Sequence, residues 1–101
     1  MIRDFFLGFI RVHLLYHASK EAIFGLDMIR ELKRHGYDLS PGTLYPILHK
    51  LEKEGYLVSE KRVYNGKVRK YYLTTDSGKE ALRKATIKVN ELIREIGINE
   101  E

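Results

Sequence analysis

The sequence contains no cysteine and no tryptophan, only two prolines, and no apolar run near the roughly 18 residues that a membrane-spanning helix needs. Without cysteine, the chain cannot form disulfide bonds, thiolate metal sites or a cysteine nucleophile. The 101 residues suffice for a single domain, and with 44% hydrophobic and 32% charged residues that domain can bury a core. The amino terminus lacks a small-residue cleavage site, so we expect no signal peptide and a cytoplasmic location.

Motifs of catalysis are also missing from the sequence. It contains no glycine-rich phosphate loop, no nucleophile elbow and no paired carboxylates in a buried context. His13 and His17 have the i, i+4 spacing of metal ligands, but the acid that a zinc protease motif places between them is absent, and their neighbours are apolar. We therefore expect partly buried histidines near an interface, no metal or cofactor, and a protein that is not an enzyme.

Positive charge is unevenly distributed along the chain. Residues 1–75 carry 13 basic and 8 acidic side chains, whereas residues 76–101 carry 5 and 6. Between residues 61 and 70, five side chains are basic and none is acidic. The five are Lys61, Arg62, Lys67, Arg69 and Lys70. A local excess of this kind favours a polyanionic partner such as a nucleic acid.

The hydrophobic pattern predicts four helices. The first covers about residues 3–18 and is apolar on most sides, so it should be covered on more than one face. The second covers about residues 25–35 and ends at Gly36. The third begins at Ser40-Pro41, because serine is a preferred N-cap and proline fits the first helical position. Its apolar residues have the spacing of one helix face: Leu44, Ile47, Leu48 and Leu51.

Between the third and fourth helices, the sequence predicts a β-hairpin. Residues 56–64 and 67–74 alternate with a period of two and flank Asn65-Gly66, the strongest short signal for a two-residue turn. The fourth helix follows, with Thr74 or Thr75 as its N-cap. Two helices joined by a short turn, then a two-stranded wing and a last helix, form the order of a winged helix-turn-helix fold. We predict this α+β, mostly α, fold.

The hairpin turn would place like charges opposite each other. It pairs Lys61 with Lys70 and Arg62 with Arg69. Directly opposed like charges are unfavourable, and a nearby polyanion would relieve the repulsion. This pairing predicts that the wing contacts DNA. The alternative is a solvated ribbon whose long side chains splay apart.

The exposed face of the third helix carries no acidic residue, which suits the major groove because phosphates line its walls and base edges offer acceptors. The predicted DNA-binding residues of this helix are Ser40, Gly42, Thr43, Tyr45, Pro46, His49, Lys50 and Lys53, to which the five basic residues of the wing are added. A different class of function is a winged helix that serves as a protein-interaction or scaffold module without binding DNA. Such a module would need neither the acid-free face nor the basic wing.

The last helix has apolar residues at the 3-4-3-4 spacing of a heptad, namely Leu82, Ala85, Val89, Leu92 and Ile96. Two heptads are too few for an independent coiled coil, so this helix either pairs between two protomers or packs within its own domain. The apolar first helix, with Phe5, Phe6 and Phe9, favours a homodimer. We expect residues 1–75 to form the DNA-binding domain and residues 76–101 the dimerisation helix. The aromatic side chains could also line a ligand cavity, although core packing explains them equally well.

Several stretches resemble the PadR family of transcriptional regulators. They are Phe24-Gly25-Leu26-Asp27-Met28-Ile29-Arg30-Glu31-Leu32, Ser40-Pro41-Gly42-Thr43-Leu44-Tyr45-Pro46-Ile47-Leu48, Leu51-Glu52-Lys53-Glu54-Gly55-Tyr56-Leu57, and Lys70-Tyr71-Tyr72-Leu73-Thr74 with Gly78. The resemblance implies a dimeric winged-helix DNA-binding protein, usually a repressor, that dimerises through its terminal helices. It also implies an interior proline such as Pro46 and a place for Tyr45 near the DNA backbone. The single carboxy-terminal helix is similar to the short PadR subfamily, and a small-molecule effector of unknown identity is left open.

Overall fold

The computed structural model describes residues 2–97, which form four helices and three short strands. In chain order these are α1 (Ile2–Lys20), β1 (Ile23–Phe24), α2 (Gly25–Arg34), α3 (Pro41–Lys53), β2 (Leu57–Tyr64), β3 (Lys67–Thr74) and α4 (Asp76–Ile96). The winged helix-turn-helix architecture predicted from the sequence is confirmed. The two predicted domains cover residues 1–75 and 76–101. Residue 1 of the first and residues 98–101 of the second lie outside the described residues. None of the described helices is long and apolar enough to cross a membrane.

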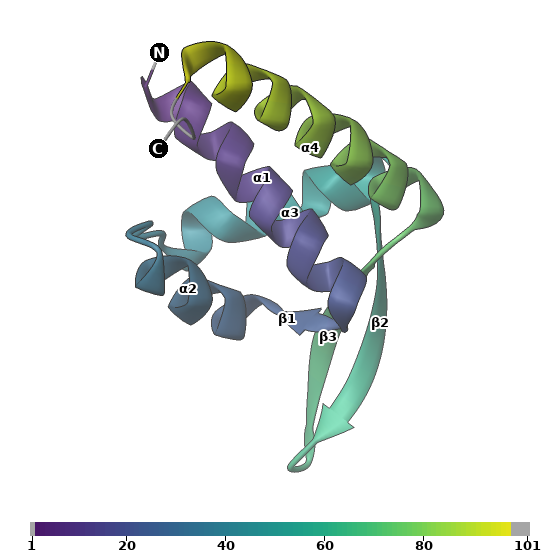
Figure 1. Ribbon diagram of the computed structural model, residues 1–101. Helices are drawn as coiled ribbons and strands as arrows, with labels where there is room; N and C mark the ends of the chain where they lie inside the picture. Colours follow the sequence, from purple (N-terminus) through teal and green to yellow (C-terminus); the bar gives the residue numbers. More distant parts are fainter. Residues whose placement is uncertain (1, 98–101) are drawn as a thin grey trace.

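The long helices α1 and α4 lie side by side and run in opposite directions (Figure 1). The helix-turn-helix pair α2 and α3 lies against the other side of α1, and the hairpin of β2 and β3 projects away from the helices (Figure 1). The described residues measure 51 × 28 × 25 Å. The wing is therefore a long projection from a small helical body.

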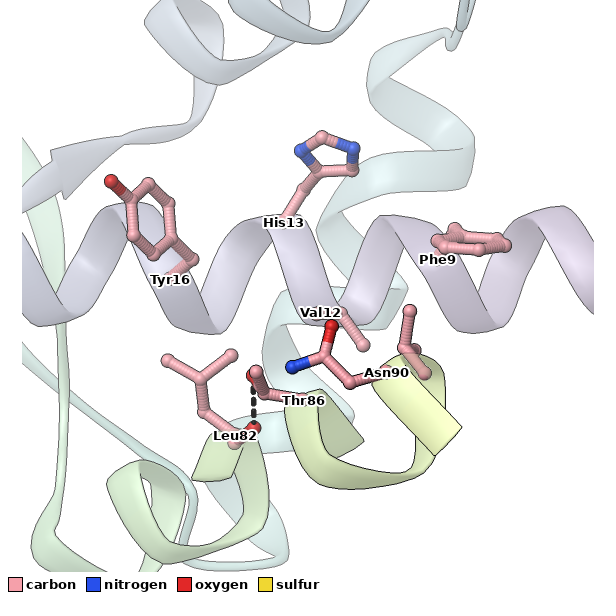
Figure 2. A pocket seen from close by; sticks show the side chains of 8 residues that line it. Phe9, Val12, His13, Tyr16, Leu82, Thr86 and Asn90 are labelled. Atoms are coloured by element: carbon pink, nitrogen blue, oxygen red, sulfur yellow. Dashed lines mark hydrogen bonds between the residues drawn. The ribbon is translucent and has the colours of Figure 1, made fainter. Parts of the chain in front are cut away.

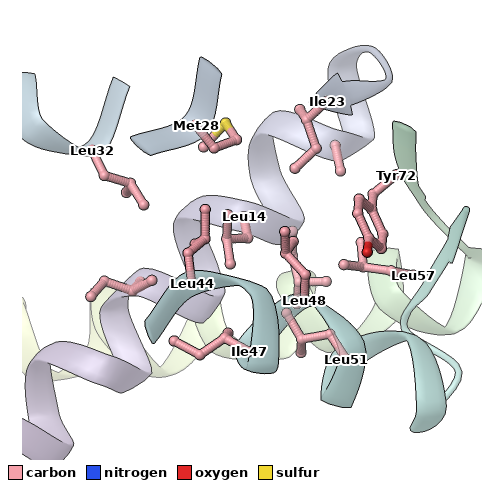
Figure 3. Close-up of a cluster of buried hydrophobic side chains, with 13 residues drawn as sticks. Leu14, Ile23, Met28, Leu32, Leu44, Ile47, Leu48, Leu51, Leu57 and Tyr72 are labelled. Carbon is pink, nitrogen blue, oxygen red and sulfur yellow. The ribbon is translucent and has the colours of Figure 1, made fainter. Parts of the chain in front are cut away.

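The core lies where α1, α2 and α3 meet the base of the sheet (Figure 3). Leu14 of α1, Leu32 of α2 and Leu48 of α3 are wholly buried. The predicted face of α3 is confirmed, because Leu44, Ile47, Leu48 and Leu51 all belong to this core. Tyr72 of β3 closes the core on the side of the wing.

The sheet has three strands in the order β1-β3-β2, and the sequence did not reveal β1 because it has only two residues. Ile23 pairs with Tyr72 and Phe24 with Tyr71. The predicted hairpin register is confirmed, with the pairs Tyr64–Lys67, Val63–Val68, Arg62–Arg69 and Lys61–Lys70. Asn65 and Gly66 both have positive φ, 51° and 76°, as the predicted turn requires.

Two details at helix ends differ from the sequence-based expectations. The sequence predicts a first helix that ends near residue 18, but α1 continues to Lys20, and the Ser19 hydroxyl donates to the carbonyl of Tyr16 at 2.6 Å. Ser40 occupies the N-cap position of α3, but its side chain makes no capping bond, and its Oγ lies 3.3 Å from Thr43 Oγ1. By contrast, the Thr75 hydroxyl caps α4 by accepting from the Gly78 amide at 3.0 Å.

Side chains near the end of β3 join α4 to the rest of the domain. The Thr74 hydroxyl donates to the carbonyl of Leu15 in α1 at 2.7 Å, and the Thr75 hydroxyl donates to the carbonyl of Gly55 at 2.6 Å. Gly78, in the first turn of α4, lies so close to the Tyr56 carbonyl oxygen that a side chain would overlap it. These contacts fix the direction in which α4 leaves the sheet.

Candidate nucleic-acid interface

The exposed face of α3 presents the residues that the sequence predicted for DNA contact. Gly42, Pro46, His49 and Lys53 are exposed and follow one another at helical spacing, while Lys50 lies exposed beside them. Thr43 and Tyr45 are partly buried at the edge of this face. The first turn of α3 contains no acidic residue. This face is therefore open to a ligand and has basic and neutral polar character.

Tyr45 links α3 to α2. A methyl group built on Gly25, the first residue of α2, would come as close as 2.7 Å to the Tyr45 ring. The ring centroid of Tyr45 also lies 6.4 Å from that of His49. The sequence suggested Tyr45 only as a DNA-contacting side chain, whereas the structure shows that its ring also sets the approach of the two helices.

The basic side chains of the wing have more partners than the sequence suggested. Arg62 Nε donates to Glu60 Oε2 at 3.2 Å, and its guanidinium lies 4.9 Å from the Tyr71 ring centroid. The Arg69 guanidinium lies 4.5 Å from the ring of Phe24 and 4.3 Å from the ring of Tyr64. Arg62 and Arg69 are opposed as predicted, but each cation has partners of its own, which offset part of the repulsion between them.

Lys61 and Lys67 are the least constrained cations of the wing. Both are exposed, and neither forms an ion pair with any of residues 2–97. Their ammonium groups can therefore bind a polyanion without first breaking an ion pair within the described residues.

Glu52 is a site residue that the sequence analysis placed only at the apolar boundary of α3. Its Oε2 accepts a hydrogen bond from the Ser59 hydroxyl at 2.6 Å, and its Oε1 lies 3.5 Å from Lys70 Nζ. The Ser59 hydroxyl and the neighbouring Lys70 cation hold the pKa of Glu52 below its ordinary value. Burial disfavours the charged form of Lys70, but the neighbouring Tyr72 and Glu52 together favour it more strongly. The pKa of Lys70 therefore lies above its ordinary value.

A second surface, formed by α1 and α4, contains the residues predicted for dimerisation. Phe9, Leu82 and Val89 line a mainly apolar groove of about 330 Å³ between the two helices, together with Val12, His13, Tyr16, Thr86 and Asn90 (Figure 2). Phe5, Phe6, Leu92 and Ile96 are exposed, by 54% for Phe5 and 65% for Ile96. Ala85 is partly buried. The early heptad residues of α4 thus pack near α1 of the same chain, and the later ones face outward.

Three histidines gather where α1 meets the end of α2. The His13 ring lies 6.2 Å from that of His17 and 5.1 Å from that of His35. His35 Nε2 lies 3.1 Å from Glu31 Oε2. Burial, followed by the nearby His35 and His17, lowers the pKa of His13. Within residues 2–97, no group of three or more such side chains has the geometry to hold a metal ion.

Comparison with known proteins gives a consistent result. The Transcriptional regulator PadR-like family matches residues 14–84. Transcriptional regulator Rv3488 of Mycobacterium tuberculosis is 45% identical over 95 residues, which cover 94% of this chain and 89% of that protein. Among solved structures, a PadR family transcriptional regulator from Eggerthella lenta is 32% identical, with a TM-score of 0.82 and coverage of 100% and 89%. The protein smu.1704 from Streptococcus mutans is 37% identical, with a TM-score of 0.80 and coverage of 90% and 86%.

Proposed function

This chain belongs to the PadR-like family of transcriptional regulators, and on that premise we propose that it acts as a homodimeric repressor that binds a specific DNA site. The observation that carries this proposal is the exposed face of α3, basic and neutral polar with no acidic residue in its first turn, beside a wing with five basic residues. Both features suit a duplex with acceptors in its grooves and phosphates along its edges. Repression is proposed because the PadR family that the sequence resembles usually consists of repressors.

In the proposed complex, α3 lies in the major groove and the wing follows the backbone or the adjacent minor groove. His49 and Lys53 face the base edges, whereas Tyr45 and Lys50 lie toward the phosphates. At the start of α3, Ser40, Gly42 and Thr43 offer backbone and hydroxyl donors to the DNA. Pro46 has no backbone N–H to donate and presents its exposed ring on the same side of the helix. On the wing, Lys61, Arg62, Lys67 and Arg69 lie along the DNA backbone, whereas Lys70, predicted with them from the sequence, is paired with Glu52 of α3.

The homodimer is proposed from the exposed apolar residues on α1 and α4. The start of α1 and the end of α4 lie next to each other (Figure 1). The exposed apolar side chains toward these two ends are Phe5, Phe6, Leu92 and Ile96. A second copy covers these side chains and places two recognition helices on half-sites separated by about one helical turn of DNA. In this arrangement, residues 1–75 bind DNA and residues 76–101 contribute to dimerisation. The groove of about 330 Å³ between α1 and α4 is large enough for a small apolar effector.

The proposal is tested by selecting DNA from a random pool with the pure protein and measuring affinity for the selected duplex. His49→Ala and Lys53→Ala should each weaken binding by about 1–3 kcal/mol and leave the fold intact, because both side chains are exposed. Lys84→Ala is the control, because it removes a positive charge, as Lys53→Ala does, but on α4 and outside the proposed DNA-binding surface. This variant should bind the duplex like the wild type. Failure to enrich any sequence, together with no binding of arbitrary duplex at low salt, would indicate the protein-interaction module instead.

A further inference from the structure

Glu52 faces the wing and not the exposed side of α3. Its two carboxylate oxygens contact different strands, because one accepts from Ser59 of β2 at 2.6 Å and the other lies 3.5 Å from Lys70 of β3. A single side chain of the proposed recognition helix therefore reaches across the base of the wing. Both partners lie on strands of the wing, 7 and 18 positions after Glu52, so neither contact is a consequence of local helix geometry.

Lys70 differs from the other basic residues of the wing. Its ammonium group lies between the carboxylate of Glu52 and the ring of Tyr72, whose centroid is 5.3 Å away. Tyr72 is buried, and its hydroxyl has no hydrogen-bond partner among the described residues. The partner of Arg62, in contrast, is Glu60, which belongs to the wing itself. Lys70 is thus held at the base of the wing by a negative charge that belongs to α3.

We propose that Glu52 is a positioning residue for DNA binding, which keeps the Lys70 cation at the base of the wing and away from the DNA phosphates. The inference rests on the proposed function. A cation that is already paired with a carboxylate does not release a counterion from DNA, so it adds nothing to the salt dependence of binding. Glu52 thereby limits the part of the affinity that is independent of sequence, because phosphate contacts carry no information on base identity.

The test measures the slope of log affinity against log salt concentration on a labelled duplex of arbitrary sequence. Glu52→Gln keeps the size of the side chain and an acceptor for Ser59 but frees the Lys70 cation. The slope should therefore become steeper by up to about 0.9 for each protomer on the DNA, and affinity at low salt should rise. Adding Lys70→Gln to Glu52→Gln should return the slope to the wild-type value, since the freed cation is then gone.

Two controls separate this role from simple effects of charge or structure. Glu54→Gln removes an equal charge from the same end of α3, where the exposed Glu54 forms no ion pair with any of residues 2–97, and it should leave the slope unchanged. Ser59→Ala removes the contact with β2 but keeps the pair with Lys70, and it should also leave the slope unchanged.

An unchanged slope for Glu52→Gln would overturn the inference, because Lys70 would then already contact phosphate in the wild type. An equal rise for Glu54→Gln would overturn it as well, since any lost negative charge would suffice. A wild-type protein that binds no duplex at low salt would instead contradict the proposed function itself.

Discussion

Gly25 at the start of α2 and Tyr45 in α3 are in such close contact that a methyl group on Gly25 would lie 2.7 Å from Tyr45 Cε1 and 2.8 Å from its Cζ and hydroxyl oxygen. The two residues are far apart in sequence, yet together they determine how closely the helices of the helix-turn-helix approach. A side chain at residue 25 would therefore have to push the Tyr45 ring aside, away from its present place in the proposed recognition surface.

Gly25→Ala should displace the Tyr45 ring and reduce the free energy of unfolding by about 1–3 kcal/mol, the usual cost of overpacking. Affinity for selected DNA should fall too, because Tyr45 and the neighbouring His49 would shift. Urea denaturation and fluorescence anisotropy measure the two effects. Gly42→Ala is the control for stability, since its nearest neighbour would be Ser40 Oγ at 3.7 Å, and it should be as stable as the wild type or more so.

Lys61→Gln combined with Lys67→Gln should reduce the salt dependence of DNA binding without affecting the fold. Neither side chain forms an ion pair with any of residues 2–97, and each removed phosphate contact should lower the slope by about 0.9. The loss should be equal on selected and unrelated duplexes. A double variant with the wild-type slope would show that neither Lys61 nor Lys67 contacts a phosphate.

Arg62→Gln should behave differently from Lys61→Gln in the free protein. If Arg62 did no more than oppose Arg69, its removal would maintain or increase stability. Because Arg62 has Glu60 and the Tyr71 ring as partners, we expect its removal to leave the free energy of unfolding unchanged or slightly lower. Thermal denaturation at low salt, with Lys61→Gln as the matched variant, distinguishes the two expectations.

Ile96→Asp should disrupt the proposed homodimer and leave the protomer folded. Ile96 is 65% exposed within one chain, so a charge there is costly only if a second copy buries it. Ile87→Asp is the control, because Ile87 is 43% exposed and lies on a different side of α4 from the heptad residues. Sedimentation should show a monomer for the first variant and a dimer for the second. A wild-type monomer at micromolar concentration would contradict the dimer.

Stability should depend on pH through His13. Because its pKa is lowered in the folded protein, by burial and then by His35 and His17, the unfolded chain binds this proton more readily. The contribution of His13 to stability is therefore complete above about pH 6.5 and is lost as the pH falls through the lower folded-state value. His13→Gln should flatten this part of the profile in urea denaturation.

The sequence was sufficient where local chemistry decides the structure. The apolar spacing of α3 identified its buried face, and Asn65-Gly66 determined the register of all the cross-strand pairs that were predicted. Both predictions depend on residues within one element or one turn, so no distant contact could change them.

The rest depended on how the elements pack against one another and on the side-chain conformations that result, which residue type alone does not determine. β1 has two residues and becomes a strand only by pairing with β3, so no periodicity could reveal it. The contacts of Glu52 with Ser59 and Lys70 arise only when α3 packs on the wing. The Ser40 side chain, a preferred N-cap by residue type, instead lies near the Thr43 hydroxyl. Residue preference correctly located the start of α3 but not the bonds made there.

The wing is attached to the body only at its base, where Leu57, Tyr72 and Thr74 are buried, while Val63 and Val68 near its tip are 74% and 67% exposed. The hairpin is therefore a lever arm. At about 3.3 Å per residue its tip lies about 23 Å from Leu57, so a tilt of about 10° at the base moves the tip by about 4 Å. Substitutions around the base, at positions that never touch DNA, can thus adjust how far the tip reaches along a groove. Such changes offer evolution, or an engineer, a way to adapt the protein to a new binding site while every DNA-contacting residue stays the same.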